Sequence, residues 1–545
     1  MKTKILLLLI LISIPCCIFS TLNYLELIGE EPRRAVVAVE MVITGEWVVP
    51  HIHGWTYYNK PPLFNWVVAG LFNAFDSFDE WIVRLPSLLS LFLIAIINFF
   101  IVRKFLSKEI AIFSSLFFVT AGEIFFYGTI RSGEIDLFYS LLVYLQIVLM
   151  FLFHFRKQYL WMFILSYFFA ALGVLTKGLP SLSFQALTLL ALVIYHKQIR
   201  LLISWKHFVG IAVFFTITGS YFYFYSQRGD VELYLINLCK EATMKSGFES
   251  KGSDLIASSL IYPLKLWLDL IPWSIFAVFL FSRRIRQKLR ENPLLAFSVM
   301  FVLVNIPLYW FTSLPNIRYV YMFLPFLMII FATAYDSAAA VWPKVNRIIG
   351  YIFTIFMIVV PVLIAIIPWS EPIAHVNHIF LKCALLFIVT VILLWRYLKE
   401  KELRIYYFIL SLIFVRVASG TIALQIIKEG RTDSASEAHI LKMLELTNNQ
   451  PITLSAPPFE FTTGLAIGSF NLREEKIKIP RPVAYQIPYY YSKHTRKVMA
   501  FSPQMELGKF YLIEDAFIEG KNVTILYQFV ECFWRKNLCL VRLNE

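Results

Sequence analysis

The feature that most constrains this chain is a series of apolar stretches, each long enough to cross a lipid bilayer. About 20 apolar residues cross the hydrocarbon core as a helix. Such stretches recur about thirteen times, near residues 5–20, 84–102, 109–129, 136–155, 159–176, 179–195, 207–226, 258–281, 294–312, 318–336, 348–369, 376–395 and 405–426. A spanning segment must satisfy its own backbone hydrogen bonds, so each stretch is expected to be a helix. The sequence therefore predicts a mainly α, polytopic membrane protein with about 13 transmembrane helices.

The composition supports this class and excludes others. Of the 545 residues, 59% are hydrophobic and only 16% are charged, which is too apolar for a soluble protein of this size. The net charge of +14 would suggest nucleic-acid binding in a soluble protein. Here much of the positive charge lies in the loops between apolar stretches. We therefore expect a lipid bilayer as partner and no nucleic acid.

The basic loops also predict the orientation. Lysine and arginine recur at 2–4, 103–108, 156–157, 197–206, 283–290, 344–347 and 396–404, which all fall on one side if every stretch crosses. The positive-inside rule makes that side cytoplasmic. We predict a plasma (inner) membrane protein with a cytoplasmic N-terminus and an extracytoplasmic C-terminal end. The first stretch could also be a cleaved signal peptide, but its removal would break the alternation of basic loops.

The sequence divides into a membrane domain and a C-terminal domain. A membrane domain is predicted for residues 1–427, with a first extracytoplasmic loop at 21–83 and a second, flexible outer loop at 226–257. Residues 428–545 regain polar composition, and stretches such as PITLSA and VTILYQFV alternate like strands. A small C-terminal extracytoplasmic α/β domain is therefore expected.

The first loop contains the densest set of polar and aromatic residues. Glu30 and Glu31 precede Pro32, which favours the first turn of a helix, and Gly45 is suited to end that helix. The predicted helix is apolar enough to lie at the membrane interface. Tryptophans and tyrosines around Lys60 are typical of the headgroup region.

Three segments of this loop, GEEPRRA, GEWVVPHIHG and YYNKPPLFNW, resemble the first extracytoplasmic loop of a known enzyme group. The group is the aminoarabinose transferase and protein O-mannosyltransferase superfamily of GT-C glycosyltransferases. The matching positions are Glu31, Arg33, Gly45, Glu46, Trp47, Val48, Val49, Pro50, Lys60 and Pro61. Glu30 replaces the usual Asp, and Asn59 replaces the usual Glu before Lys-Pro. The resemblance implies a GT-C fold and transfer of a sugar from a polyprenyl-phosphate donor, with inversion at the anomeric carbon.

Three later segments carry ionisable residues beside apolar stretches. GTIRSGEIDLFYS supplies Arg131 and Asp136, LTKGLP supplies Lys177, and SLPNIRYVYMFLP supplies Arg318. Ionisable groups beside a bilayer are costly unless they are paired, solvated or functional. A polar turn at Asp136, a snorkelling anchor at Lys177 and a helix-end anchor at Arg318 are the alternatives without chemistry. The superfamily has similar residues at these places, which favours a functional role.

The resemblance and the chemistry together assign roles. Glu30 is the candidate general base or acceptor-positioning acid, since a carboxylate within hydrogen-bond distance can take the acceptor's proton. Because Glu30 stands where the superfamily has Asp, the choice of base among the acids stays open. Glu31 and Asp136 would orient neighbouring groups or hold a metal. Cations stabilise charge on a leaving phosphate, and the candidates are Lys60, Arg33, Arg131, Lys177 and Arg318. The candidates for substrate contact are Tyr58 and Tyr319.

A divalent metal remains open in this sequence. The aminoarabinose transferases have a His in the second outer loop and a Glu before Lys-Pro that resemble a metal-binding pair. This chain has Asn59 and no His between 226 and 257. A metal would have to use Glu30 and Asp136, with His51 or His53, whereas both histidines are more simply interfacial aromatics. The sequence therefore assigns no certain cofactor, and a divalent metal held by Glu30 and Asp136 is the alternative.

The acceptor and the reaction class have alternatives. Lipid A is suggested by the aminoarabinose transferases, and a protein hydroxyl by the mannosyltransferases. A flippase for lipid-linked sugars would also have many spans, but the internal repeats and broken midplane helices of transporters are not evident. An accessory protein without catalysis is the third alternative. We expect a monomer that binds a polyprenyl-phosphate-linked donor and a lipid or protein acceptor.

Overall fold

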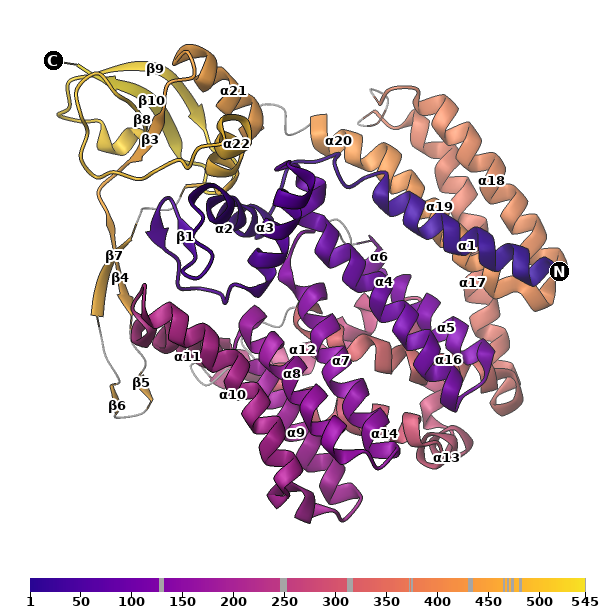
Figure 1. Ribbon diagram of the computed structural model, residues 1–545. Coiled ribbons are helices and arrows are strands. Elements are labelled where there is room, and N and C mark those ends of the chain that lie inside the picture. Colours follow the sequence, from indigo (N-terminus) through magenta and orange to yellow (C-terminus); the bar gives the residue numbers. More distant parts are fainter. Residues whose placement is uncertain are drawn as a thin grey trace.

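The structure is a computed structural model that describes most of the chain (Figure 1). It covers residues 1–126, 132–245, 252–310, 317–371, 373, 376–429, 435–463, 466–467, 470–471, 475–479 and 483–544. Within these ranges, the side chains of residues 241–258, 429 and 459–482 are not described.

Helices dominate the first 429 residues. The α-helices in this part are α1 (Lys2–Phe19), α2 (Glu31–Thr44), α3 (Leu63–Phe75), α4 (Glu80–Phe105), α5 (Lys108–Val119), α6 (Gly122–Phe126), α7 (Ile135–Phe155), α8 (Tyr159–Lys177), α9 (Pro180–Tyr195), α10 (Trp205–Ser226), α11 (Val231–Lys245), α12 (Gly252–Asp269), α13 (Arg283–Glu291), α14 (Pro293–Asn305), α15 (Pro307–Trp310), α16 (Leu324–Val341), α17 (Pro343–Ile366), α18 (Ile379–Lys399), α19 (Arg404–Ala418) and α20 (Leu424–Glu429). The 3₁₀ segments η3 (Trp273–Phe281) and η4 (Ile317–Phe323) precede α13 and α16. A one-turn π-helix, η7 (Ser419–Ala423), joins α19 to α20.

Ten helical segments in the described part of the chain are long and apolar enough to cross a bilayer. An eleventh span is formed if Ser259–Asp269 and η3, which meet at a 119° bend, count as one. Every predicted apolar stretch coincides with helix, but α5 and α9 are shorter than a standard span. The mainly α, polytopic fold is therefore confirmed, whereas the number of about 13 spans stays a prediction.

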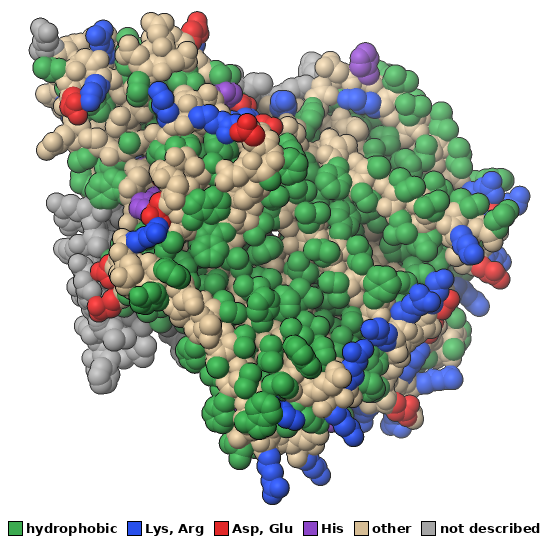
Figure 2. All heavy atoms as spheres, viewed as in Figure 1, with side chains coloured by type: hydrophobic (Ala, Val, Ile, Leu, Met, Phe, Trp, Pro, Cys, Tyr) green, Lys and Arg blue, Asp and Glu red, His purple; other side chains and the backbone are tan. Residues whose placement is uncertain are grey.

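Helix α7 is one of the two most enclosed candidate spans, together with the Ile317–Val341 segment that contains α16. About 78% of its apolar window is buried inside the protein, compared with 28% for α1, α10 and α18. The latter helices expose large apolar side chains, including Phe380, Leu381 and Leu385 on α18. In Figure 2 a broad hydrophobic surface crosses the molecule, and lysine and arginine side chains gather along its lower right edge. This distribution is the one expected of helices that present apolar side chains to lipid.

Helix α2 begins and ends where the sequence predicts. Pro32 occupies its first turn, and Gly45 ends it with a φ of 73°. The prediction of an interfacial helix differs from the structure in one respect. The apolar residues Val36, Val37 and Val39 are at most 2% exposed, because protein covers them on all sides. Their hydrophobicity is used within a shared protein core, so they do not face lipid.

The C-terminal segment contains the predicted mixture of helices and strands. Strands β3 (Ile452–Ser455), β8 (Phe510–Glu514), β9 (Val523–Val530) and β10 (Asn537–Leu543) form a sheet in the order β3-β8-β10-β9. The β3–β8 pair is parallel and the others are antiparallel. Helices α21 (Ser436–Leu446) and α22 (Gln486–Thr495) accompany this sheet. The short strand pairs are β1 (His51–Ile52) with β2 (Trp55–Thr56), β4 (Phe459–Thr463) with β7 (Glu475–Ile479), and β5 (Ala466–Ile467) with β6 (Phe470–Asn471).

Helix α22 joins this C-terminal segment to the first loop (Figure 1). Gln486 donates to the carbonyl of Leu27 at 3.1 Å, and the Tyr489 hydroxyl donates to the carbonyl of Phe78 at 2.5 Å. Both regions belong to one hydrophobic core. The C-terminal segment therefore packs against the first loop and holds it in place through α22.

A buried acid and a buried imidazole lie at the same junction. Glu40 on α2 accepts hydrogen bonds from the backbone N–H groups of His53 (2.5 Å) and Gly54 (3.0 Å). His53 Nδ1 lies 3.1 Å from the carbonyl oxygen of Met499. Burial raises the pKa of Glu40 to about 7 and lowers the pKa of His53 to about 4. Both side chains are therefore stabilised in their neutral forms.

These shifts predict opposing pH dependences. The neutral Glu40 favours folding below its unfolded pKa of 4.5, and this stabilisation is lost as the pH rises from 4.5 to about 7. The neutral His53 favours folding above 6.5, and this stabilisation is lost as the pH falls from 6.5 to about 4. The two slopes cancel between pH 4.5 and 6.5 in the wild-type protein.

Substitution of either residue should uncover the slope of the other. We expect E40Q to lose about 1.4 kcal/mol of stability per pH unit on acidification below 6.5, and H53N to gain a similar amount. Asn is chosen because His53 has a φ of 58°, which Asn tolerates. Thermal unfolding of the purified protein between pH 4.5 and 6.5 measures both slopes. Parallel pH profiles for the two variants would contradict this assignment.

Candidate active site

Asp136 and Lys177 form a buried ion pair near the ends of two central helices. Asp136 lies in the first turn of α7, where the helix dipole favours an anion. Lys177 is the last residue of α8, and Gly178, with a φ of 92°, allows the chain to turn there. Lys177 Nζ lies 2.5 Å from Asp136 Oδ1, and both side chains are less than a tenth exposed.

Two tyrosine rings surround the ammonium group of Lys177. Its nitrogen lies 5.2 Å from the ring centre of Tyr139 and 4.6 Å from that of Tyr319. Rings at this distance attract a cation through their electron-rich faces. The carboxylate and the rings together fix the position of one positive charge.

A second ion pair joins Glu134 to Arg318. Glu134 is the N-cap residue of α7, and Arg318 lies in η4. Both side chains are partly exposed, at 14% and 29%. Gly29 approaches this pair closely, since a Cβ atom on Gly29 would lie 3.5 Å from Glu134 Oε1. The pair therefore brings the first loop, α7 and η4 together.

Glu31 and Arg84 form a third pair, and it is fully buried. Arg84 on α4 donates to both carboxylate oxygens of Glu31, at 3.2 and 3.0 Å. Glu31 also accepts from the backbone N–H groups of Ile28 (2.9 Å) and Gly133 (2.5 Å). Glu31 is 0% exposed and makes four hydrogen bonds, so in this conformation it fixes Arg84 and the backbone before α7.

Arg84 holds the first loop with its remaining donors. It donates to the carbonyl oxygens of Leu22, Leu25 and Glu26. A guanidinium group provides five donors in a fixed planar fork, which suits this many acceptors. Glu31 thus orients Arg84. The sequence did not predict Arg84 as a phosphate ligand.

Glu30 is the exposed acid of the first loop. Its side chain is 43% exposed and pairs with Arg33 at 3.0 Å and Arg34 at 3.6 Å. The Arg33 guanidinium also lies 5.0 Å from the ring centre of Tyr485. Of the two neighbouring acids, Glu30 is therefore the one that a substrate can reach.

Lys60 and Tyr58 lie on the loop before α3. Lys60 is 8% exposed, and the Tyr58 ring is 6.5 Å from that of Tyr234 on α11. Phe64, in the first turn of α3, packs against Phe138 on α7 with ring centres 5.7 Å apart. This contact places the beginning of α3 against the helix that carries Asp136.

The sequence also predicted Arg131 as a phosphate ligand and left a metal site as an alternative. Arg131 lies outside the described residues. Within the described ranges, no group of three or more His, Cys, Asp or Glu residues could hold a metal ion. Asp136 and Glu30 instead pair with Lys177 and Arg33. His53, a weak candidate ligand, is buried beside Met499.

The sequence reasoning gave no role to three of these groups. Glu134 lies within the segment GTIRSGEIDLFYS, and Arg84 begins the apolar stretch 84–102, but neither was assigned a role. Glu123 on α6 accepts a hydrogen bond from the Tyr321 hydroxyl at 3.1 Å. All three lie within or beside predicted spans, so the rule that intramembrane charges are functional candidates could have identified them.

The described groups include one exposed carboxylate and two cations, each held in an ion pair. An exposed carboxylate, Glu30, lies one residue from a buried pair that contacts the segment before α7. Fixed cations at Lys177 and Arg318 lie beside the beginning of that helix. Fixed cations can neutralise a phosphate, and a carboxylate can accept a proton.

Known proteins resemble this chain in sequence. Residues 59–223 match the family model described as dolichyl-phosphate-mannose-protein mannosyltransferase. An uncharacterized protein of Aquifex aeolicus is 24% identical over 306 residues, which are 55% of this chain and 58% of that protein. The undecaprenyl phosphate-alpha-4-amino-4-deoxy-L-arabinose arabinosyl transferase of Yersinia enterocolitica is 26% identical over 185 residues, 32% of each chain. The match thus spans little more than half the length of the first relative and about a third of the second.

The resemblance in structure extends over nearly the whole chain. ArnT from Cupriavidus metallidurans bound to undecaprenyl phosphate has a TM-score of 0.69 and 15% identity, covering 98% of this chain and 97% of ArnT. Its apo state gives the same TM-score at 14% identity, with 99% and 98% covered. The chain therefore has the fold of ArnT, and the resemblance predicted from the first loop is confirmed.

Proposed function

We propose that this chain, an ArnT-like GT-C protein, is an integral membrane glycosyltransferase that takes its sugar from a polyprenyl-phosphate donor. The observation that carries the proposal is the contact network at the beginning of α7. There the first loop, the α8–α9 turn and η4 meet through the pairs Glu31–Arg84, Asp136–Lys177 and Glu134–Arg318. The ArnT structure with bound undecaprenyl phosphate supports a donor of that class.

The proposed roles follow from exposure and pairing. Lys177 and Arg318, with Lys60 and Arg33, would stabilise charge on the departing polyprenyl phosphate. Asp136 would hold Lys177 in place, since the pair is buried and close. Glu30 would take the proton of the acceptor hydroxyl as that oxygen attacks the anomeric carbon.

In this mechanism one bond to the anomeric carbon forms and another breaks. The acceptor oxygen forms a bond to the anomeric carbon, and the bond from that carbon to the phosphate oxygen breaks. The proton passes to Glu30, and the electron pair leaves with the polyprenyl phosphate. Attack from the face opposite the phosphate would invert the anomeric configuration.

Lipid A is the proposed acceptor because the named relatives are arabinosyl transferases of the ArnT type. The family model favours a protein hydroxyl as the second candidate. The positive-inside rule supports a site on the extracytoplasmic face of the inner membrane, where either acceptor is found.

The test is transfer by the purified full-length protein in lipid nanodiscs. It would be given undecaprenyl phosphate carrying a radiolabelled sugar, with lipid A in one reaction and a serine-containing peptide in another. Label on lipid A confirms the proposal, and label on the peptide replaces the acceptor. Movement of the donor between leaflets without transfer to any acceptor would instead identify a flippase.

A further inference from the structure

A second polar cavity lies at the opposite ends of the helices that carry the candidate site. Helix α7 has Asp136 in its first turn and His154 in its last turn. At 1.5 Å per residue these positions are about 27 Å apart along the axis, close to the thickness of a bilayer core. Helix α8 runs back from Tyr159 at the cavity to Lys177 at the site. The two places therefore belong to opposite membrane surfaces.

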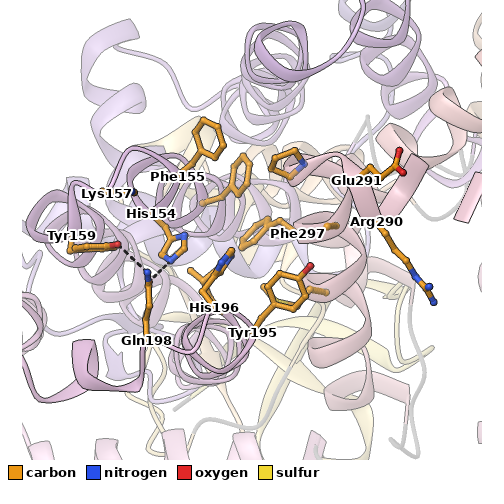
Figure 3. A pocket seen from close by; sticks show the side chains of 15 residues that line it. His154, Phe155, Lys157, Tyr159, Tyr195, His196, Gln198, Arg290, Glu291 and Phe297 are labelled. Atoms are coloured by element: carbon orange, nitrogen blue, oxygen red, sulfur yellow. Dashed lines mark hydrogen bonds between the residues drawn. The ribbon is translucent and has the colours of Figure 1, made fainter. Parts of the chain in front are cut away.

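The cavity has a volume of about 330 Å³ and lies between α7, α9 and α14 (Figure 3). A volume of this size is within the range of small-molecule sites. Its wall is partly apolar, with the rings of Phe155, Phe297 and Tyr195. Phe155 and Tyr195 are 53% and 63% exposed, so the cavity continues into a surface suited to acyl chains.

The inner part of the cavity is polar and ordered. His154 Nε2 lies 3.0 Å from Gln198 Oε1, and Gln198 Nε2 donates to the Tyr159 hydroxyl at 3.3 Å. The ring centres of His154 and His196 are 4.6 Å apart, and Figure 3 shows the two imidazoles facing the same space. The Gln198 oxygen accepts the Nε2–H of His154, so His196 is the imidazole of this pair that can offer an N–H donor to an anion.

Cations stand at the rim of this cavity. Lys157 follows α7, and Arg290 lies in the last turn of α13. Neither has an acidic partner among the residues that the structure describes. The one acid in the lining, Glu291, already accepts a hydrogen bond from Gln287 at 2.7 Å. With two cations and one carboxylate, the lining carries a net positive charge beside an apolar wall.

We propose that this cavity binds the headgroup of an anionic phospholipid from the cytoplasmic leaflet. The phosphate would lie near Lys157, Arg290 and His196, and an acyl chain would follow the apolar wall past Phe155. Basic pockets between helices on the cytoplasmic side bind such headgroups, and the loops around this cavity are the basic ones that the positive-inside rule makes cytoplasmic. The apolar wall distinguishes a lipid from a soluble phosphate.

The test uses native mass spectrometry of the full-length protein titrated with phosphatidylglycerol or phosphatidylcholine. The wild-type protein should bind phosphatidylglycerol at least tenfold more tightly than phosphatidylcholine. The K157Q/R290Q variant should lose this preference. The matched control is K344Q/R347Q, which removes the same charge from exposed residues of α17 on the same face. Equal losses in both variants would mean surface attraction only and would overturn the proposal.

Two further measurements distinguish the cavity from the surface and the lipid from a free anion. A296W would fill the cavity without changing charge, and it should weaken phosphatidylglycerol binding at least tenfold. Retained binding would place the lipid elsewhere. Millimolar inorganic phosphate should not displace the lipid from the wild-type protein, and displacement would assign the cavity to a soluble phosphate. Unfolding temperatures of all variants within 2 °C of wild type exclude misfolding as the cause.

Discussion

Replacing Asp136 with asparagine is expected to lower the rate of sugar transfer by on the order of 100- to 1,000-fold. The carboxylate fixes Lys177 at 2.5 Å, and Asn cannot supply the opposing charge. Lys177 would then lose the position from which it stabilises the leaving phosphate. D136E should recover part of the rate, because it restores the charge with a longer side chain. The measurement is transfer of labelled sugar at saturating donor by protein of unchanged unfolding temperature.

The pairing of Asp136 with Lys177 also predicts the rate of the double variant. Since Asp136 and Lys177 act as a unit, the variant D136N/K177M should be no slower than K177M alone. The matched control is D336N, which removes the partner of Lys288 in an exposed ion pair of 3.2 Å. It should leave the rate within twofold of wild type. Multiplicative losses in the double variant would show that the two residues act independently.

Removing either partner of the Glu31–Arg84 pair is expected to destabilise the protein by about 3–5 kcal/mol. Both side chains are at most 2% exposed, and each single substitution leaves the other charge buried without its partner. E31Q and R84M should therefore lower the unfolding temperature of the detergent-solubilised protein strongly. The variant E31L/R84M should be less destabilised than either single variant, because no buried charge remains.

Glu30 provides the contrast to Glu31 within the same segment. Its side chain is 43% exposed, so E30Q should change stability by less than about 1 kcal/mol. Because Glu30 is the proposed base, E30Q should nevertheless lower the rate of sugar transfer by on the order of 100-fold or more. The two neighbouring acids are thus separated by two readouts. A stable E31Q protein, or an E30Q protein with the wild-type rate, would reverse these roles.

Local features of this fold could be predicted from the sequence where short-range chemistry determines them. Pro32 and Gly45 correctly indicated the ends of α2, because each favours a specific backbone conformation. The apolar stretches correctly indicated the helices, since length and hydrophobicity determine whether a segment can span. The charged residues Asp136 and Lys177 were recognised as costly at a helix end, and they proved to be partners.

Long-range packing could not be predicted in this way. The apolar face of α2 is compatible with lipid or with protein, and only the folded chain reveals that α22 covers it. Gln486 and Leu27 are more than 450 residues apart, and no local pattern connects them. The different environments of Glu30 and Glu31 have the same origin, because adjacent helical residues point in different directions. Glu31 is the buried acid of the two, because it pairs with the buried Arg84.

The most direct test is a cryo-electron microscopy structure of the full-length protein in nanodiscs with undecaprenyl phosphate. The central claim is that separate segments meet at the beginning of α7 to hold a lipid-borne phosphate. It predicts phosphate density within hydrogen-bond distance of Lys177 or Arg318, on the face that carries Glu30. Phosphate density at the far end of α7 beside His154, with none near Lys177 and Arg318, would contradict it.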